Sequence, residues 1–336
     1  MSNLQGKLRV EASINDSGRL QNEKLIPVLK EKDYFIIDRP LDGDAPKQFI
    51  GAYFYQEESG VRRKNPKSWF SYIAKTAEKW YPHESVIEYM INRIGEEMGL
   101  VMNEVKLVKG NGQIRFLSKY FLNKNQKLVH GAEICGEHLG DVDMAKQIAE
   151  SKSTARDLFT FEFIKEAITA VFSHCHDHIV QDLVRMITFD ALVGNNDRHF
   201  YNWGVIDNKK KTHKPLKLAP IYDSARGLLW NFSDENIIAT YKSHVGGSNK
   251  ITNYIEGACP RISIENNKEA NHFDLVKYVK HENKEYEKIV NELSSVENED
   301  KVIVMLKREF FPFFIPERGS LTEIIVRSRF KKIREI

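Results

Sequence analysis

Short runs of apolar and β-branched residues predict several strands in the first third of the chain. Each run is bounded by polar or glycine-containing turn residues, which is typical of strands joined by tight connections. The predicted strands are Tyr34–Ile37, Phe49–Tyr55, Trp69–Ala74, Val105–Val108 and Phe116–Tyr120. The turn Lys109-Gly110-Asn111-Gly112 separates the last two runs. We therefore expect an antiparallel sheet.

A single helical pattern interrupts these strands. Its apolar residues recur at intervals of three and four positions, which places them on one face of a helix. They are Val86, Ile87, Met90, Ile91, Ile94 and Met98. Gly99 follows directly, and glycine is common just after the end of a helix. The pattern predicts one helix over Glu84–Met98.

After about residue 130 the pattern becomes mainly helical. The predicted helices are Ala145–Ser151, Thr154–Phe172 and Ile179–Leu192. Two short strands, Trp203–Ile206 and Lys217–Ala219, surround an exposed lysine-rich turn and predict a hairpin. Two or three amphipathic helices are expected after His272, broken around Phe310–Pro316 by two prolines. The chain should therefore have an α+β fold in which a β-rich part precedes a mainly α-helical part.

The composition narrows the class of protein. Hydrophobic residues make up 41% and charged residues 29% of 336 residues, the balance of a globular protein with a packed core. The net charge of +3 is too small to indicate a nucleic-acid surface. Three separated cysteines imply no disulfide framework, and no stretch is long and apolar enough for a membrane span or a Sec signal. We expect a cytoplasmic protein without nucleic-acid or membrane partners.

Polar residues that can carry chemistry gather between the helix 179–192 and the hairpin. Asp197 and Asn202 lie five positions apart there, a spacing used by kinase catalytic loops. The carboxylate of Asp197 would orient an acceptor hydroxyl and take its proton, and the amide oxygen of Asn202 would bind Mg²⁺. Asp223 follows the second hairpin strand, so strand pairing would return it to Asn202 as a second metal ligand. Taken singly, these residues also suit ordinary turns.

The same segment resembles the HipA-like kinase family. That family has a Gly-Asn-x-Asp-x-His-x-x-Asn loop followed by a Tyr-Asp metal site. The residues that match are Gly194, Asn195, Asp197, His199, Asn202, Tyr222 and Asp223. The resemblance implies a bilobal protein-kinase-like fold, with an N-lobe over residues 1–121 and a helical C-lobe over residues 122–336. It also implies ATP and Mg²⁺ as cofactors, with His199 supporting the catalytic loop through hydrogen bonds.

The resemblance also implies residues on the nucleotide side. Lys75, at the end of a predicted strand, would meet the phosphates, and Glu88 on the helix 84–98 would hold that lysine. The alternative for both is an ordinary solvated side chain. Gly60, Val61 and Lys64 would belong to a short phosphate loop, although a basic hairpin turn explains them as well.

The segment Arg115–Phe121 resembles the hinge strand of the family. Its residues Lys119, Tyr120 and Phe121 would line the adenine pocket; the alternative is a plain amphipathic strand. The cluster His174-Cys175-His176-Asp177-His178 contains zinc-type ligands, but a polar link between two helices explains it without metal.

The function predicted from these residues is serine/threonine protein kinase activity of the HipA-like type. The resemblance implies autophosphorylation, a role as a toxin or as an effector exported without a Sec signal peptide, and a small antitoxin or regulatory protein as partner. The alternatives are a small-molecule or lipid kinase of the same fold and a nucleotide-binding pseudokinase regulated by a partner.

Overall fold

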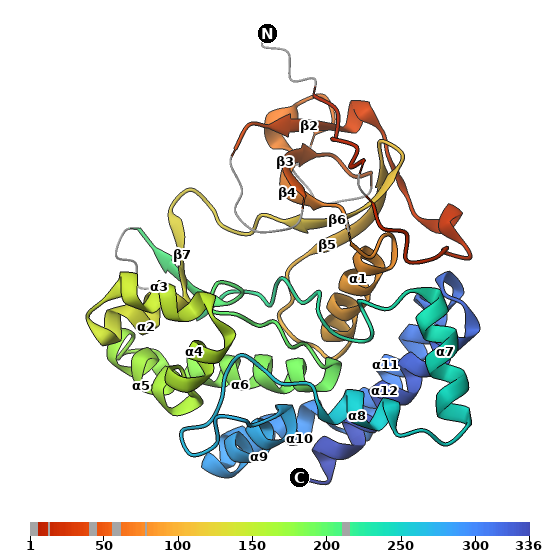
Figure 1. Cartoon of the computed structure of the whole chain (residues 1–336). Helices are drawn as coiled ribbons and strands as arrows, with labels where there is room; N and C mark the ends of the chain where they lie inside the picture. Colours follow the sequence, from red (N-terminus) through yellow and green to blue (C-terminus); the bar gives the residue numbers. More distant parts are fainter. Residues whose placement is uncertain (1–5, 13, 40–45, 56–61, 78, 210–215) are drawn as a thin grey trace.

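A computed structural model describes residues 6–12, 14–39, 46–55, 62–77, 79–209 and 216–336. The first part of the chain forms a six-stranded sheet with the strand order β1-β5-β6-β4-β3-β2 (Figure 1). The strands are β1 (Val28–Leu29), β2 (Tyr34–Ile37), β3 (Lys47–Ala52), β4 (Phe70–Lys75), β5 (Val105–Gly110) and β6 (Gln113–Lys119). Short 3-10 turns lie at Glu23–Leu25, Glu31–Asp33 and Pro66–Ser68.

The hairpin β5–β6 shows how the local sequence sets this sheet. Asn111 and Gly112 form its two-residue turn, with φ of 48° and 82°. Positive φ at both positions is the geometry that Asn-Gly favours between antiparallel strands. The prediction of an antiparallel sheet holds for five of the six strands, whereas β1, which was not predicted, pairs in parallel with β5.

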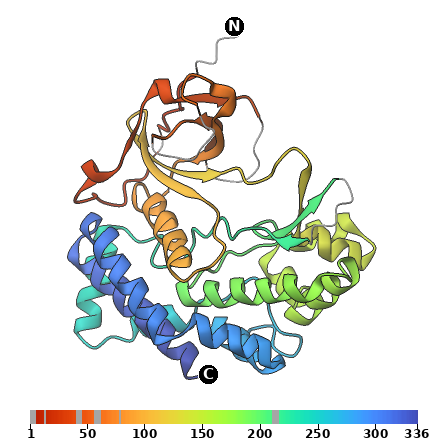
Figure 2. The same cartoon turned by 180° about the vertical axis from the view of Figure 1, so that it is seen from behind.

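Helix α1 (His83–Glu97) lies between this sheet and the helical part of the molecule (Figures 1 and 2). Its apolar face is buried against both, as its periodicity predicted. One large core contains α1 together with the helices that follow, and a smaller core lies on the sheet around Tyr34, Ile50, Tyr72 and Leu117. Helix α1 is thereby packed against the helical part, which matters for the residues that it carries.

The rest of the chain is mainly helical, as expected. The helices are α2 (Gly131–Leu139), α3 (Val142–Glu150), α4 (Lys152–Leu158), α5 (Phe161–Val171), α6 (His176–Val193), α7 (Asp234–Val245), α8 (Lys250–Glu256), α9 (His272–Glu282), α10 (Lys284–Leu293), α11 (Val296–Glu309) and α12 (Pro316–Arg334), with a 3-10 turn at Phe311–Phe313. A second sheet has the order β7-β8-β9, formed by β7 (Gln126–His130), β8 (Gly204–Asn208) and β9 (Lys217–Leu218). The division of the chain at residue 121 stays a prediction.

Three details of the helical part differ from the sequence predictions. The expected helix over residues 154–172 is two helices, because Thr160 caps α5 by accepting a hydrogen bond from the Phe163 N–H. Four helices, not two or three, follow residue 271. Strand β7 and helices α2, α7 and α8 were not predicted. No helix in the described part of the chain is long and apolar enough to cross a membrane.

Candidate active site

Lys75 joins the large sheet to α1 and to the turn after β9. It is the last residue of β4, and its side chain is largely buried. Its Nζ lies 3.0 Å from Oε1 of Glu88 on α1 and 2.5 Å from Oδ1 of Asp223. The structure therefore brings together three of the residues selected from the sequence, although they come from three separate elements.

Burial and charge act in opposite directions on these three groups. Burial lowers the pKa of Lys75, but Asp223 and Glu88 raise it by more, so it lies above its usual value. Burial raises the pKa of Asp223, but Lys75, together with His199 and Arg198, lowers it by more, to about 2. For Glu88, burial outweighs the attraction of Lys75 and raises the pKa to about 7. Lys75 and Asp223 are thus both charged at neutral pH.

A buried arginine fixes the loop between α6 and β8. Helix α6 ends at Gly194, which has φ of 69°. Arg198 in the loop pairs with Asp190 in the last turn of α6, with Nε–Oδ2 and Nη2–Oδ1 distances of 2.8 and 2.9 Å. The Asn195 amide donates to the same carboxylate at 2.9 Å. This two-point pairing sets the direction in which the loop leaves the helix.

Arg198 also connects the two predicted metal ligands. Its Nη1 donates to the carbonyl oxygen of Asn202 at 3.1 Å and to that of Tyr222 at 2.5 Å. The Asn202 side chain donates in turn to the Asp197 carbonyl oxygen at 3.1 Å. Asp223 follows Tyr222 with φ of 55°, an uncommon conformation for a residue with a side chain. One guanidinium therefore holds the Asp197–Asn202 loop against the turn that presents Asp223.

The Asp197 carboxylate is paired with two arginines. Arg261 donates to Oδ1 through Nη2 at 2.7 Å and through Nε at 3.2 Å. The Nε of Arg226 lies 3.1 Å from Oδ2. Both oxygens of the predicted catalytic carboxylate thus have a cationic partner.

His199 contacts the backbone of its own loop. Its ring Nδ1 accepts a hydrogen bond from the Tyr201 backbone N–H at 3.2 Å. Its own backbone N–H donates to the Asp197 carbonyl oxygen at 2.8 Å. Burial lowers the pKa of His199 in spite of the nearby Asp197, which favours the neutral ring that can accept this bond. The role of His199 as a support of a catalytic loop stays a prediction.

The predicted hinge residues begin with Lys119, the last residue of β6, and continue beyond the strand. The Lys119 N–H donates to the Glu104 carbonyl oxygen and the Tyr120 N–H to that of Ser71, at 2.9 and 2.8 Å. The Lys119 side chain is paired with Glu104. The ring of Phe121 lies 5.6 Å from that of Tyr222, which places this segment beside the Asp223 turn. Contact with adenine stays a prediction.

Two other groups named from the sequence lie outside these contacts: the phosphate loop, which stays a prediction, and the histidine-rich segment. Gly60 and Val61 lie outside the described residues, and Lys64 is exposed. In the histidine-rich segment 174–178, His176 contacts the Ser173 carbonyl oxygen and Asp177. Nowhere in the described ranges do three or more His, Cys, Asp or Glu side chains gather as a metal site.

Four site residues were missed in the sequence. Asp190 and Arg198 lie in or next to the recognised loop and could have been suspected from their opposite charges. Arg226 lies three positions after Asp223. Arg261 comes from a distant segment without a local signal, so only the folded chain shows its position.

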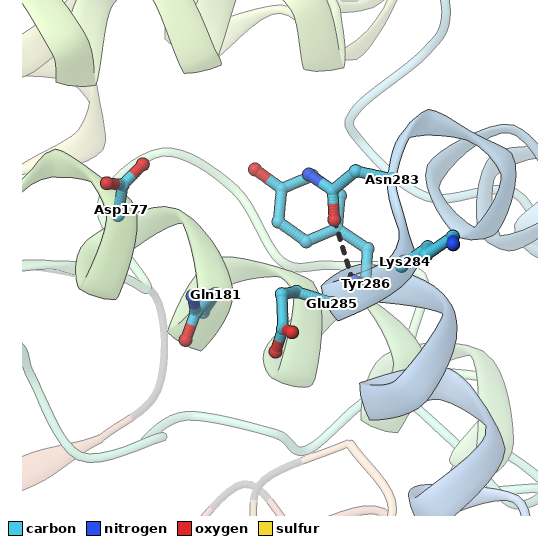
Figure 3. Close-up of a pocket in the computed structure, with 6 residues that line it drawn as sticks. All are labelled: Asp177, Gln181, Asn283, Lys284, Glu285 and Tyr286. Atoms are coloured by element: carbon cyan, nitrogen blue, oxygen red, sulfur yellow. Dashed lines mark hydrogen bonds between the residues drawn. The ribbon is translucent and has the colours of Figure 1, made fainter.

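A surface hollow lies apart from this site. It is located between α6 and the beginning of α10, where Asn283 Oδ1 accepts a hydrogen bond from the Tyr286 N–H at 3.0 Å (Figure 3). Its lining residues are Asp177, Gln181, Asn283, Lys284, Glu285 and Tyr286. Of these, only Asp177 was named from the sequence, as part of the histidine-rich segment, and none contacts the Lys75 or Asp197 groups in the described contacts.

The fold and the position of these residues define the protein-kinase-like class: a β-rich part with one helix, then a mainly helical part that carries the loop 194–204. A family model described as HipA-like C-terminal domain matches residues 41–300. The chain therefore belongs to the HipA-like family.

Three known proteins are similar to this chain. A putative kinase of Haemophilus influenzae is 27% identical over 161 residues, which are 46% of this chain and 44% of the relative. The matched segment thus spans less than half of that relative. The crystal structure of the Helicobacter pylori proinflammatory kinase CtkA has a TM-score of 0.69 at 17% identity, covering 92% of this chain and 96% of CtkA.

A second similar structure is the Shewanella oneidensis toxin–antitoxin complex of HipA, HipB and operator DNA. The TM-score is 0.50 at 10% identity, covering 89% of this chain and 65% of the matched chain. At such low identities the two structural matches establish the fold, which is mixed α+β and kinase-like.

Proposed function

We propose that this protein is an ATP- and magnesium-dependent kinase that phosphorylates serine or threonine hydroxyls in proteins. The observation that carries the proposal is the position of Lys75. Its Nζ contacts Glu88 on α1 and Asp223 in the turn after β9. A lysine fixed in this way presents a positive charge to the phosphates of a nucleotide. Family membership supports kinase chemistry in general. That the acceptor is a serine or threonine hydroxyl of a protein is the further step that we propose.

The donor atoms fit a magnesium ion. Asp223 supplies a carboxylate that is ionised at neutral pH, and Asn202 supplies an amide oxygen on the neighbouring loop. Mg²⁺ prefers such hard oxygen ligands and usually takes few of them from the protein. When bound, the ion would neutralise charge on the nucleotide phosphates.

Asp197 would orient the acceptor hydroxyl and accept its proton. Its backbone is held by the Asn202 amide and the His199 N–H, so the loop is fixed before substrates bind. Preorganisation of this kind is the main contribution of the protein in phosphoryl transfer. Lys75 would contact the phosphates, and Glu88 would keep Lys75 in place.

The experiment is phosphate transfer from γ-labelled ATP with magnesium, followed by mapping of the labelled amino acid. Asp197→Asn should lower turnover by roughly 10²–10⁴-fold, with Mg·ATP binding retained. Asp207→Asn on β8 is a matched control, because that carboxylate pairs with Lys127 away from the loop. Equal labelling in Asp197→Asn and wild type would refute the assignment of the base.

Two other functions stay open to the same experiment. The pairing of both Asp197 oxygens with arginines favours a nucleotide-binding pseudokinase under the control of a partner. That function predicts Mg·ATP binding without transfer. A small-molecule or lipid kinase predicts label in a metabolite or lipid pool and none in protein.

The biological setting is also part of the proposal. The similar Shewanella oneidensis protein is described in complex with HipB and operator DNA, which motivates a search for a small antitoxin-like partner of this chain. Co-purification from the native host, with and without nuclease treatment, would identify such a partner. Autophosphorylation would appear as label on the chain itself in the transfer assay.

A further inference from the structure

The two arginines on Asp197 are held in different ways. Arg261 makes two hydrogen bonds to one oxygen, and its side chain is 16% exposed. Arg226 contacts the other oxygen through Nε, and its side chain is 42% exposed. The more exposed and less fully bound partner is the one that can leave at a lower cost.

Hydrogen bonds from α4 hold the segment around Arg261. Arg156 is buried and donates to the carbonyl oxygen of Pro260 at 2.5 Å. The Ser263 hydroxyl donates back to the Arg156 carbonyl oxygen. Lys152 donates to the Cys259 carbonyl oxygen at 3.1 Å. Because the backbone is tied on both sides of Arg261, this side chain is suited to hold Asp197 in one orientation.

Arg226 combines a fixed backbone with an exposed side chain. Its carbonyl oxygen accepts a hydrogen bond from the Asn196 N–H at 3.3 Å, and Gly227 packs closely against the backbone of Val193. The guanidinium lies over the ring of Trp230, with Cζ 5.3 Å from the ring centre. The backbone of Arg226 is therefore fixed beside the Asp197 loop, while its side chain stays partly exposed.

The charge of Arg226 is also felt at the Lys75 end of the site. Burial raises the pKa of Glu84 in the first turn of α1, and the positive charge of Arg226 is the largest influence that lowers it, followed by Lys75. Arg226 thus pairs with Asp197 and also acts electrostatically on the first turn of α1, the helix that carries Glu88. It follows Asp223 by three positions, so it cannot lie far from the proposed metal side.

A carboxylate oxygen can accept about two hydrogen bonds, and Arg261 already makes two to Oδ1. An acceptor hydroxyl would therefore meet Asp197 at Oδ2, beside Arg226. We propose that Arg226 is catalytic: in the resting site it pairs with Asp197, and in the loaded site it contacts the transferring phosphoryl group. The inference rests on the proposed kinase function. Arg261 remains on the other oxygen as a positioning residue.

The chemical step balances without a further reactant. The bond between the γ-phosphorus and the bridging β,γ-oxygen breaks, and a bond from that phosphorus to the acceptor oxygen forms. The hydroxyl proton passes to Asp197, and ADP leaves with the electron pair of the broken bond. Arg226 would stabilise charge on the non-bridging oxygens, as arginines do in other phosphoryl-transfer sites.

The experiment compares wild type, Arg226→Ala and Arg226→Lys in single-turnover transfer from Mg·γ-labelled ATP. Arg226→Ala should lower the transfer rate by about 10³-fold, whereas the dissociation constant of Mg·ATP should change by less than about threefold. Methylguanidinium in the assay should restore part of the rate in Arg226→Ala, since it supplies the missing group. Arg185→Ala on α6 is the control, because Arg185 pairs only with Asp182 of its own helix in the described contacts.

The other outcomes overturn the inference in distinguishable ways. Faster transfer in Arg226→Ala would mean that the pair with Asp197 is an inhibitory contact. An unchanged transfer rate in Arg226→Ala would mean that Arg226 is not catalytic. A reduced rate that methylguanidinium does not restore, together with a lower melting temperature, would assign Arg226 a structural role. Failure of the proposed function is separate, because wild type itself would then transfer no phosphate although it binds Mg·ATP.

Discussion

Lys75 and Asp223 are 148 positions apart in the chain, yet Nζ and Oδ1 are 2.5 Å apart. The lysine also holds Glu88, so one cation meets two carboxyl groups. Asp223 stays ionised and its side chain is 38% exposed, so its carboxylate can contact a metal ion as well as Lys75. The pair therefore couples the nucleotide side of the proposed site to its metal side.

The first prediction concerns the charge of Asp223. Asp223→Asn keeps the size of the side chain but removes the charge, so magnesium-dependent nucleotide affinity should fall by at least about tenfold, or 1.4 kcal/mol. Titration with a fluorescent ATP analogue at several magnesium concentrations measures this change. Asp207→Asn should bind as wild type does. Equal affinity of Asp223→Asn at every magnesium concentration would argue against Asp223 as a ligand.

The second prediction concerns the buried pair of Arg198 and Asp190. Arg198→Met leaves the Asp190 carboxylate buried without its main partner, which should lower the free energy of unfolding by about 3–5 kcal/mol. Urea unfolding followed by circular dichroism measures the loss. Adding Asp190→Leu should restore only part of the stability, because the carbonyl oxygens of Asn202 and Tyr222 still lack their donor.

A matched surface pair provides the control for that measurement. Arg185 and Asp182 are partly exposed neighbours on α6. Arg185→Met should change stability by less than about 1 kcal/mol, as is usual for exposed ion pairs. Similar losses for Arg198→Met and Arg185→Met would show that burial of Arg198 does not matter in the way argued.

The sequence predicted those features that depend on nearby residues. The period of Val86, Met90 and Ile94 indicated α1, and Asn111-Gly112 indicated the β5–β6 hairpin. The spacing of Asp197 and Asn202 was visible because both lie on one loop. Strand β7 was not predicted, because its sequence Gln126–His130 is polar and becomes a strand only by pairing with β8.

Residues that act over long sequence distances were harder to predict. Lys75 and Glu88 were selected through the family resemblance, since a lysine and a glutamate at these positions could equally be ordinary solvated side chains. Arg261 could not be assigned, because its approach to Asp197 depends on the anchoring of a whole segment by Arg156. The pairing of Asp197 with two arginines is therefore a property of the tertiary structure.

The third prediction concerns pH and His83 at the beginning of α1. Its side chain is fully buried; Nδ1 lies 2.9 Å from the Ser17 hydroxyl, and Nε2 lies 3.4 Å from Asp234, which is itself paired with Arg318. Burial, with the charge of Arg318, lowers the pKa of His83 to about 3. In the unfolded chain the His83 ring binds a proton near pH 6.5, whereas in the folded chain it stays neutral down to about pH 3. The free energy of unfolding that His83 contributes is therefore lost as pH falls from 6.5 toward 3.

This dependence can be isolated by comparing wild type with His83→Gln. Between pH 7.5 and pH 5.0, wild type should lose up to about 2 kcal/mol more of its free energy of unfolding than the variant. The buried His272, whose pKa is also lowered by burial, is present in both proteins and cancels in the comparison. Parallel pH profiles would show that His83 takes up a proton in the folded state as easily as in the unfolded state.

The fourth prediction concerns Gly194, which ends α6 and begins the Asp197 loop. A Cβ at this position would lie 2.9 Å from Cζ of Arg329, and φ is 69°. Arg329 is fully buried and donates to the carbonyl oxygens of Ala191 and Ile255, so it cannot move aside easily. Gly194→Ala should therefore combine backbone strain with a steric conflict. It should also displace the loop and lower phosphate transfer.

Gly140 separates these two effects. It ends α2 with φ of 74°, and a Cβ there would meet no atom within 4 Å. Gly140→Ala should cost about 1 kcal/mol of stability from the backbone conformation alone and leave transfer unchanged. Gly194→Ala should cost at least about 1 kcal/mol more, because overpacking adds to the same strain. If both variants lose the same stability and keep the same transfer rate, Arg329 yields to the new methyl group and the loop does not depend on this contact.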